Sequence, residues 1–528
     1  MCQHTTIDLL KKGFWKKYVD CKDGEEKINP FTEVPWYVVG HLVKYTFSFP
    51  LRKSLLPNHK YLYLLLSSHP LQRLDLSSFK RFKNDFDPAP NNLSQNLICT
   101  LIQYMSGSDE SQAMQELSLL LYKLSENDCP DLRSIIIPSY IELCSRAVES
   151  LIRVSPNLED FHARSVLNIE IFQHCQNLRS LMLHGDRTIY SIEDNLSSIQ
   201  NVEYLEFCDV DYVCYRRHEI IAKILNNLPN LVSLGKLDTS MALNYIKAQE
   251  NHITNFKLQR CFWGINEDSL ARAHVQPIVY HRYKSDSTNI IKNAASLCPS
   301  VEVLAIQVFQ KDCLQYLCLL KQLRFLRLDF TVCVDTYLDA FLSLINDIGK
   351  QLKHLSVSDR GSDEIQPPSV VRFPIDIICK NSINLESLQL KGLSTINNPL
   401  EVRTSLCNLK RLFIENINSY DFMLILQNCF NLTELFIKNL PILDSSELEK
   451  IFYKSSLLNL RKLCIFTSEL SEAAMKTVLA KAVNLEKVYF DKSQYSASLL
   501  EVMNHGAVFD SELLQSEFLN PGLSNCRF

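Results

Sequence analysis

Glycine is scarce in this sequence, with 12 residues among 528, well under the roughly 7% of average usage. Loops that cradle phosphate need glycine because the backbone must approach the ligand closely. The motifs G-x-x-x-x-G-K-[ST], G-x-G-x-x-G, G-x-S-x-G and H-E-x-x-H are all missing. The sequence therefore indicates neither a nucleotide-dependent enzyme, nor a serine hydrolase, nor a zinc peptidase. We expect a protein with no catalytic activity and no cofactor.

An excess of positive charge and long apolar runs are also missing. Lys and Arg number 55 against 59 Asp and Glu, for a net charge of -4. This balance gives no electrostatic reason to expect nucleic acid or an anionic membrane as partner. No apolar run approaches the roughly 20 residues that cross a bilayer, and residues 1–17 lack the apolar core of a signal peptide. A chain of this size does not need its 18 cysteines as a disulfide framework. We expect free thiols and a cytoplasmic or nuclear protein that binds neither nucleic acid nor a membrane.

The pattern L-x-x-L-x-L, with L any aliphatic residue or Phe, recurs through most of the chain. Copies begin at residues 71, 132, 178, 202, 253, 301, 323, 352, 385, 409, 432, 460 and 485, and weaker copies begin at 158 and 231. The starts are mostly 20 to 33 residues apart, which brackets the period of leucine-rich repeats. The intervals that follow residues 71 and 253 are nearly double, so we expect each to hide one degenerate repeat.

The last two apolar residues of each copy alternate as one face of a short strand requires. Helix-like stretches such as 335–352 lie between the strands. A strand and a helix within about 25 residues bury their apolar faces only by stacking on neighbouring repeats. The predicted fold is an α/β leucine-rich-repeat solenoid, a horseshoe with a parallel concave sheet, a helical convex side and a helical N-terminal cap. The predicted divisions are residues 1–66 (helical), 67–495 (repeats) and 496–528 (C-terminal cap or tail).

Cysteine precedes the first aliphatic residue of four repeats by three positions, at Cys129, Cys175, Cys298 and Cys429. A small, weakly polar side chain suits the tight corner where a helix turns into a strand. This C-x-x-L-x-x-L-x-L form, over roughly residues 67–495, resembles the repeats of F-box and leucine-rich-repeat proteins, which are substrate receptors of cullin-type ubiquitin ligases. The resemblance implies a non-enzymatic interaction scaffold that recognises a ligase substrate. A ribonuclease-inhibitor-like regulatory binding protein without any ligase link stays open as the alternative.

Residues 1–66 lack the repeat pattern and are predicted to be helical. Repeat arrays need caps over their terminal apolar faces, so a cap is one role for this segment. Receptors of the F-box kind instead open with a helical adaptor-binding module that begins with Leu-Pro or a similar pair. Here Val34 and Pro35 precede Val38, Val39 and Leu42, and the resemblance implies that these five residues bind a cullin adaptor. The Cys-x-x-Trp that often closes an F-box is absent, so both roles stay open.

Positions three, five and seven of each repeat are predicted to point away from the core, on the solvent side of the concave sheet. In the last four repeats, position five holds Phe413, Phe436, Cys464 and Tyr489, position three holds Arg411, Glu434, Lys462 and Lys487, and Phe466 occupies a position seven. Exposed aromatic residues flanked by charge are typical of an interface hot spot. We therefore expect a protein partner to bind this stripe, or else the C-terminal tail to fold back over it.

Two groups of cysteines are candidates for metal binding or thiol chemistry. Cys208, Cys214 and His218 form C-x5-C-x3-H, whereas structural zinc sites favour paired ligands two to four residues apart. A packed cysteine beside an exposed loop is therefore the better interpretation, and no metal is expected. Cys313 and Cys318 follow a helical apolar spacing that makes both of them core thiols.

Overall fold

The computed structural model describes residues 73–75, 118, 121–122, 125, 129–137, 144–163, 168–184, 192–208, 217–249, 255–264, 277–330, 337–359, 375–393, 406–417, 422, 425–439, 457–466 and 481–490. The chain divides into two compact units, Met1–Val210 and Asp211–Phe528. Each unit is described by itself.

The first unit is a parallel sheet with helical connections. Its described strands pair in chain order: β1 (Arg73–Asp75), β2 (Ser134–Ile136), β3 (Asp160–Ala163), β4 (Ser180–His184) and β5 (Tyr204–Cys208). Its described helices are α8 (Ser145–Arg153) and the 3-10 helices η1 (Ile169–His174) and η2 (Leu196–Ile199). Helix α8 buries Ala147, Val148, Leu151 and Ile152, a single face at helical spacing.

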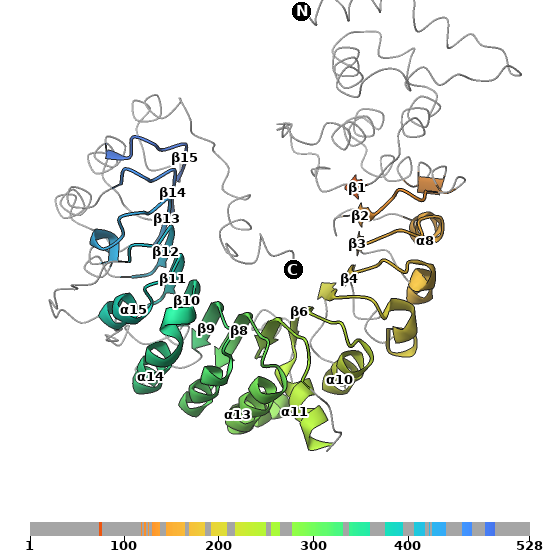
Figure 1. Cartoon of the computed structure of the whole chain (residues 1–528), viewed down its shortest axis with the longest axis horizontal. Helices are drawn as coiled ribbons and strands as arrows, with labels where there is room; N and C mark the ends of the chain where they lie inside the picture. Colours follow the sequence, from red (N-terminus) through yellow and green to blue (C-terminus); the bar gives the residue numbers. More distant parts are fainter. Residues whose placement is uncertain are drawn as a thin grey trace, which may run out of the picture. The chain divides into compact units, whose positions relative to one another are not determined.

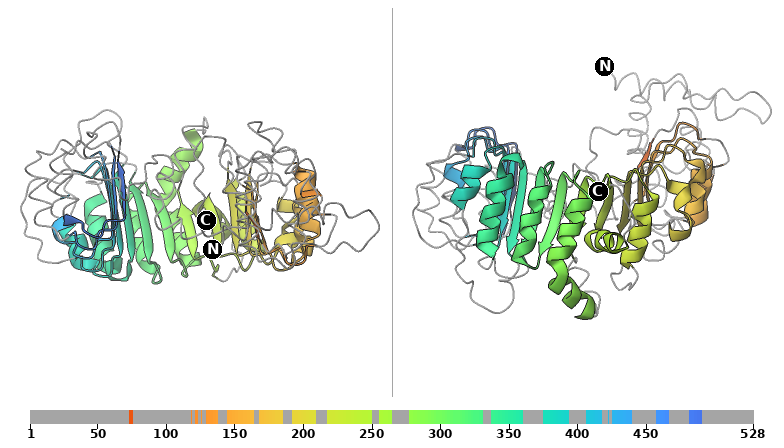
Figure 2. Two further views of the ribbon diagram at one scale, coloured as in Figure 1. Left: turned by 90° about the horizontal axis from the view of Figure 1, so that it is seen from above. Right: turned by 60° about the horizontal axis from the view of Figure 1, so that its bottom comes forward.

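The second unit continues the same plan with ten described strands, again parallel and in chain order. They are β6 (Ser233–Asp238), β7 (Arg260–Trp263), β8 (Val303–Val308), β9 (Phe325–Phe330), β10 (His354–Asp359), β11 (Ser387–Lys391), β12 (Arg411–Glu415), β13 (Glu434–Lys438), β14 (Lys462–Phe466) and β15 (Lys487–Phe490). The helices are α10 (Arg217–Asn227), α11 (Ser240–Ala248), α13 (Pro277–Leu297), η3 (Lys311–Leu319), α14 (Leu338–Ile348), η5 (Gly349–Gln351) and α15 (Ile375–Asn381). They lie on one side of the sheet (Figure 1, Figure 2). None of the helices in the described ranges is long and apolar enough to cross a membrane.

Each of the 15 copies of the pattern that the sequence shows contains a strand, and the pattern decides which side chains enter the core. In β12, Leu412 and Ile414 are 2% and 0% exposed, and Leu409 before the strand is fully buried. On the helical side, α14 buries Phe341, Leu344, Ile345 and Ile348 as one face at helical spacing. The prediction of an α/β leucine-rich-repeat solenoid is confirmed.

The register of one repeat differs from the prediction. The copy expected to begin at Ile253 begins at Leu258, because β7 starts at Arg260. Cys261 and Trp263 take its fourth and sixth positions and are 5% and 0% exposed. This register was not predicted because the repeat pattern accepts only aliphatic residues and Phe at its apolar positions.

The two hidden repeats were wrong predictions. Strand β1 pairs directly with β2, and β7 pairs directly with β8, so in the described part of the chain no further strand lies between the two members of either pair. In the second interval, the extra length includes the 21-residue helix α13. The weak copy at Leu231 also has a structural reason: the register of β6 with β7 shifts between Ser233 and Asp238. Leu237, one residue later than expected, is therefore the buried side chain, at 1% exposure.

An asparagine directly before the first aliphatic residue closes the corner of many repeats. Its side-chain amide donates to a backbone carbonyl of the preceding repeat, as Asn201 does to Gln176 at 2.8 Å and Asn384 does to Lys350 at 2.7 Å. These bonds satisfy carbonyl groups that the turn leaves without a backbone partner. In the last five repeats the asparagine row consists of Asn384, Asn408, Asn431, Asn459 and Asn484.

Candidate interaction surfaces

The predicted stripe at position five forms a cluster of its own. Phe413, Phe436, Cys464 and Tyr489 face one another across β12–β15 in exact register and pack together; we call them the aromatic ladder. The rings of Phe413 and Phe436 are stacked with centroids 4.2 Å apart and planes 9° apart. Phe466 packs against Phe436 at 5.5 Å. Strand alternation places the ladder on the sheet face opposite the core residues Leu412 and Ile414.

The expectation that these rings are exposed is wrong. Phe413, Phe436 and Tyr489 are only 4%, 7% and 7% exposed, and Cys464 is 0% exposed. Neighbouring strands are about 4.8 Å apart, which is close enough for planar side chains to stack, as Phe413 and Phe436 do. The sheet therefore converts a stripe of separate rings into a packed layer. Partner binding at this layer stays a prediction, and the tail considered as an alternative cover, residues 496–528, lies outside the described residues.

Charged side chains flank the aromatic ladder at position three. Arg411, Glu434 and Lys462 are half-buried and Lys487 is exposed, and the strand register places the four in one row. The Lys462 ammonium lies 5.9 Å from the centre of the Tyr489 ring, within the range of a cation–π contact. The row thus places charge along one side of the apolar layer.

A row of ion pairs at position seven was missed by the sequence reasoning. Glu415 is 4% exposed, and its Oε1 lies 2.9 Å from Lys438 Nζ and 3.7 Å from Lys391 Nζ. Phe466 continues the same row on β14. The alternating signs of Lys391, Glu415 and Lys438 at equivalent positions were the available signal. This row fixes the edge of the aromatic ladder across three strands.

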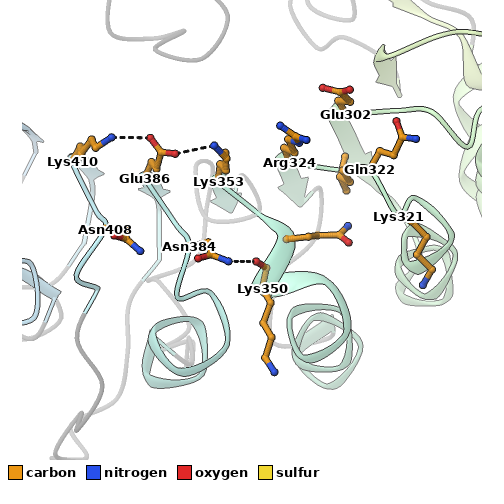
Figure 3. A pocket seen from close by; sticks show the side chains of 12 residues that line it. Glu302, Lys321, Gln322, Arg324, Lys350, Lys353, Asn384, Glu386, Asn408 and Lys410 are labelled. Carbon is orange, nitrogen blue, oxygen red and sulfur yellow. Dashed lines mark hydrogen bonds and ion pairs between the residues drawn. The ribbon is translucent and has the colours of Figure 1, made fainter.

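Two adjoining open cavities lie beside the starts of the strands and form the rim groove. They measure about 610 and about 680 Å³ and share Asn408 and Lys410. The first is lined by side chains that stand in a row in Figure 3, where Glu386 bridges Lys353 and Lys410. The ion-pair distances are 3.2 and 3.1 Å. These bonds hold the pKa of the Glu386 carboxyl below its ordinary value, with Lys410 as the largest cause.

The buried cysteines Cys175 and Cys313 are protonated thiols. Burial raises the pKa of Cys175 to about 11 and that of Cys313 to about 12. Because the thiolate is the nucleophile, such thiols are unreactive at neutral pH. Cys313 is a core residue at 1% exposure, as predicted. Cys318 is not: it is half-buried, and its Sγ donates to Asp347 Oδ2 at 3.2 Å, because η3 is a 3-10 helix and turns it away from the core.

Three of the four corner cysteines are buried. Cys175, Cys298 and Cys429 are 4%, 0% and 1% exposed, whereas Cys129 is half-buried. Of the zinc candidate, Cys214 lies outside the described residues, and the ring of His218 packs edge-on against Tyr245 at 5.4 Å. Within the described ranges, no three or more His, Cys, Asp or Glu residues gather as metal ligands would.

The predicted adaptor-binding residues Val34, Pro35, Val38, Val39 and Leu42 lie outside the described residues, as does all of segment 1–66. The cap and adaptor interpretations of that segment both stay predictions.

Comparison with known proteins adds little to these surfaces. No family model and no curated protein matches the chain. The chain is similar to the crystal structure of the Rad7 and Elc1 complex in yeast, at 14% identity and TM-score 0.36, over 79% of this chain and 92% of that one. It is also similar to internalin C2 from Listeria monocytogenes, at 16% identity and TM-score 0.22, over 39% and 92%. Likenesses this weak carry no argument, so fold and function rest on the chain's own residues.

Proposed function

We propose that this chain is a non-enzymatic protein–protein interaction scaffold. The observation that carries the proposal is the aromatic ladder, which lies on the sheet face away from the core and is flanked by charged side chains. Parallel sheets are generally covered on both faces, and in the second unit the described helices cover one (Figure 1). Packed aromatic residues with a charged rim are the makeup of an interface centre. Stacking also orders the rings before a partner arrives, which lowers the entropy cost of binding.

More specifically, we propose that the chain is the substrate-recognition subunit of a cullin-type ubiquitin ligase in the cytoplasm or nucleus. The corner cysteines of the repeats support this reading, because their spacing resembles that of F-box and leucine-rich-repeat receptors. The residues proposed to bind the adaptor are Val34, Pro35, Val38, Val39 and Leu42. The residues proposed to bind the substrate are those of the aromatic ladder and the charged side chains beside it. The cysteines described as free thiols suit a reducing compartment.

The alternative is a ribonuclease-inhibitor-like regulatory protein that binds its partner without a ligase. Both functions use the sheet face, but only the receptor needs an adaptor surface in residues 1–66. Capture of a cullin adaptor therefore distinguishes them.

The sheet-face site is tested by exchanging two of its charges, Glu434→Lys with Lys487→Glu, in the full chain. This change keeps the net charge and leaves the buried rings intact, so the melting temperature should stay the same. Capture of protein partners by co-precipitation should fall at least about tenfold, because charges at an interface rim become repulsive.

The matched control is the exchange Lys311→Glu with Asp312→Lys, two exposed residues on the helical side of the unit. It should leave both capture and melting unchanged. Equal capture by the sheet-face variant and the control would show that no partner binds at the ladder.

A further inference from the structure

Exposed apolar side chains recur at one repeat position in the second unit, two residues before the first aliphatic residue. Ile383, Phe430, Leu458 and Val483 occupy it and are 50%, 49%, 57% and 69% exposed; Cys407, at the same position, is exposed as well. Single exposed apolar residues need no explanation. These five, however, precede β11–β15, which lie side by side. They therefore form a continuous strip, the apolar rim row.

As an exposed surface, the apolar rim row is confined to these repeats among the described residues; Phe256, at the same position in the repeat of β7, is half-buried. Of the six large hydrophobic residues that are exposed in the described part of the chain, four belong to it. In the repeat before Ile383 the same position holds Lys350, and in the first unit it holds Pro130 and Gln176. If this position tolerated any residue, exposed polar and apolar side chains would be mixed along the repeats. Instead, exposed apolar residues begin at Ile383 and continue through five repeats.

The backbone of the apolar rim row is held in place by the asparagine row. The amide nitrogens of Asn408, Asn431, Asn459 and Asn484 donate to the carbonyls of Ile383, Cys407, Phe430 and Leu458 at 3.0, 2.6, 3.4 and 2.7 Å. Each apolar side chain is thus displayed from a corner that is already rigid. A preorganised surface loses little conformational entropy when it binds.

The rim groove runs alongside this row and carries the opposite sign of charge to the whole chain. Cys407 and Val483 of the apolar rim row line its second cavity together with Lys410 and Arg461. Its first cavity is lined by the cations Lys321, Arg324, Lys350, Lys353 and Lys410 and by the carboxylates Glu302 and Glu386. The excess of three positive charges contrasts with the net charge of -4 for the chain. An anionic partner would be attracted to this edge.

One carboxylate of the chain itself already lies in the groove between two lysines, as the carboxylate of a bound partner would. Glu386 sits between Lys353 and Lys410, 3.2 and 3.1 Å from their ammonium groups (Figure 3). Arg324 and Lys350, both exposed, lie along the same edge. The strand spacing thus allows a carboxylate to bridge cations from two different repeats.

We propose that the rim groove and the apolar rim row together bind an extended segment of a partner protein in which apolar residues alternate with Asp and Glu. This proposal rests on the proposed scaffold function and adds the chemistry of a partner at a second surface. Nucleic acid fits less well, because its phosphate backbone offers no apolar side chains to cover the exposed residues of the apolar rim row. From β9 to β15, six intervals of about 4.8 Å span roughly 29 Å, the length of about nine extended residues.

The experiment uses the full chain and a fluorescein-labelled nonapeptide, Glu-Leu-Glu-Phe-Asp-Leu-Glu-Val-Glu, with fluorescence anisotropy as the readout. A peptide with Lys in place of each acidic residue is the probe control. We expect the acidic peptide to bind and the basic one not to bind. The affinity should fall at least fivefold in Phe430→Ser with Leu458→Ser, and likewise in Arg324→Gln with Lys350→Gln.

A third variant should act in the opposite direction. Glu386→Gln removes the internal carboxylate that competes for Lys353 and Lys410, so the acidic peptide should bind about two- to fivefold more tightly. The control for lost charge is Lys223→Gln with Lys380→Gln, two exposed lysines on helices, which should leave the affinity unchanged. All of the changed side chains are exposed or half-buried, and unchanged thermal melting verifies that each variant is folded.

The proposal is overturned if the acidic peptide does not bind, if both peptides bind alike, or if the rim variants bind as the lysine control does. A further contrary outcome is displacement of the peptide by an unrelated DNA duplex with the same dependence on Arg324 and Lys350. That outcome would indicate that the groove binds nucleic acid and not a protein segment. The outcome is separable from that of the sheet-face test, because Glu434→Lys with Lys487→Glu leaves the rim groove intact. That variant should bind the acidic peptide normally.

Discussion

Leu435 is the residue at which the predicted repeat register can be tested by a single substitution. It occupies the fourth position of its repeat, is fully buried, and pairs with Leu412 and Leu463 on the adjacent strands. Leu435→Ala should lower the free energy of unfolding by roughly 2–5 kcal/mol, since it removes buried methyl groups and leaves a cavity. In a repeat stack the damage stays local, so hydrogen exchange of amides in residues 409–465 is the measurement. The control is Glu434→Ala, one residue away on the other face, with a change of no more than about 0.5 kcal/mol.

His354 makes stability depend on pH. Burial, followed by the charge of Arg411, lowers its pKa to about 4, and the guanidinium of Arg411 lies 3.4 Å from the ring nitrogen. The unfolded chain gains a proton near the ordinary value of 6.5 and the folded chain does not until about pH 4. The contribution of His354 is therefore fully present above pH 6.5 and is lost as the pH falls from 6.5 toward 4.

The loss should be on the order of 1–3 kcal/mol, measured as the urea midpoint between pH 7.5 and 4. His354→Gln should flatten the profile within this window. The carboxylate of Glu386 does not produce the same signal, because its pKa is lowered from 4.5 and its contribution is lost only as the pH falls through 4.5 and below, at the acid end of the window. An identical pH profile for the variant would rule out His354 as the cause.

At the scale of strands, two glycines are expected to differ in the substitutions they tolerate. One position requires glycine, whereas the other can also accept asparagine. Gly264 ends β7 with φ +140°, and a Cβ there would lie 2.5 Å from Cβ of Gln307 on β8. Gly264→Ala should cost about 2–4 kcal/mol, through backbone strain and overpacking between the two strands. The measurement is the shift of the urea midpoint.

The companion change is Gly392→Asn, after β11. Gly392 has φ 69°, and at the equivalent positions after β12 and β13 the chain itself uses Asn416 and Asn439 at φ 53° and 51°. Asparagine tolerates this left-handed conformation, so the change should alter stability by no more than about 0.5 kcal/mol. Equal losses from Gly264→Ala and Gly392→Asn would contradict this distinction.

The strands themselves were predictable because apolar residues at positions four and six leave a short segment few other ways to bury them. The prediction missed the register of β7, where Cys261 and Trp263 replace aliphatic residues. It also inferred strands from the length of two intervals, although length alone does not distinguish a missing repeat from a longer connection such as α13.

For the whole molecule, the decisive prediction concerns recruitment of a cullin adaptor. Val39→Asp with Leu42→Asp in the full chain should abolish co-precipitation of the adaptor, because charge at an apolar interface remains desolvated and unpaired. Hydrogen exchange of β8–β15 should be unchanged. The matched control is His41→Asp with Lys44→Asp in the same predicted helix, which should keep the adaptor. Loss of protection throughout the repeats would instead identify residues 1–66 as a cap and remove the main support for the receptor.

The amino-acid sequence by itself determined the repeat, the strand in each repeat and the side chains that enter the core, since these depend on the spacing of residues near one another in the chain. It also placed Phe413, Phe436 and Tyr489 in one row. Only the tertiary structure decided that these rings stack and are covered, because their exposure depends on strands about 4.8 Å apart and not on sequence neighbours. The same holds for the apolar rim row. Ile383, Phe430, Leu458 and Val483 are unremarkable one at a time in the sequence, and they become a surface only when stacking places the repeats side by side.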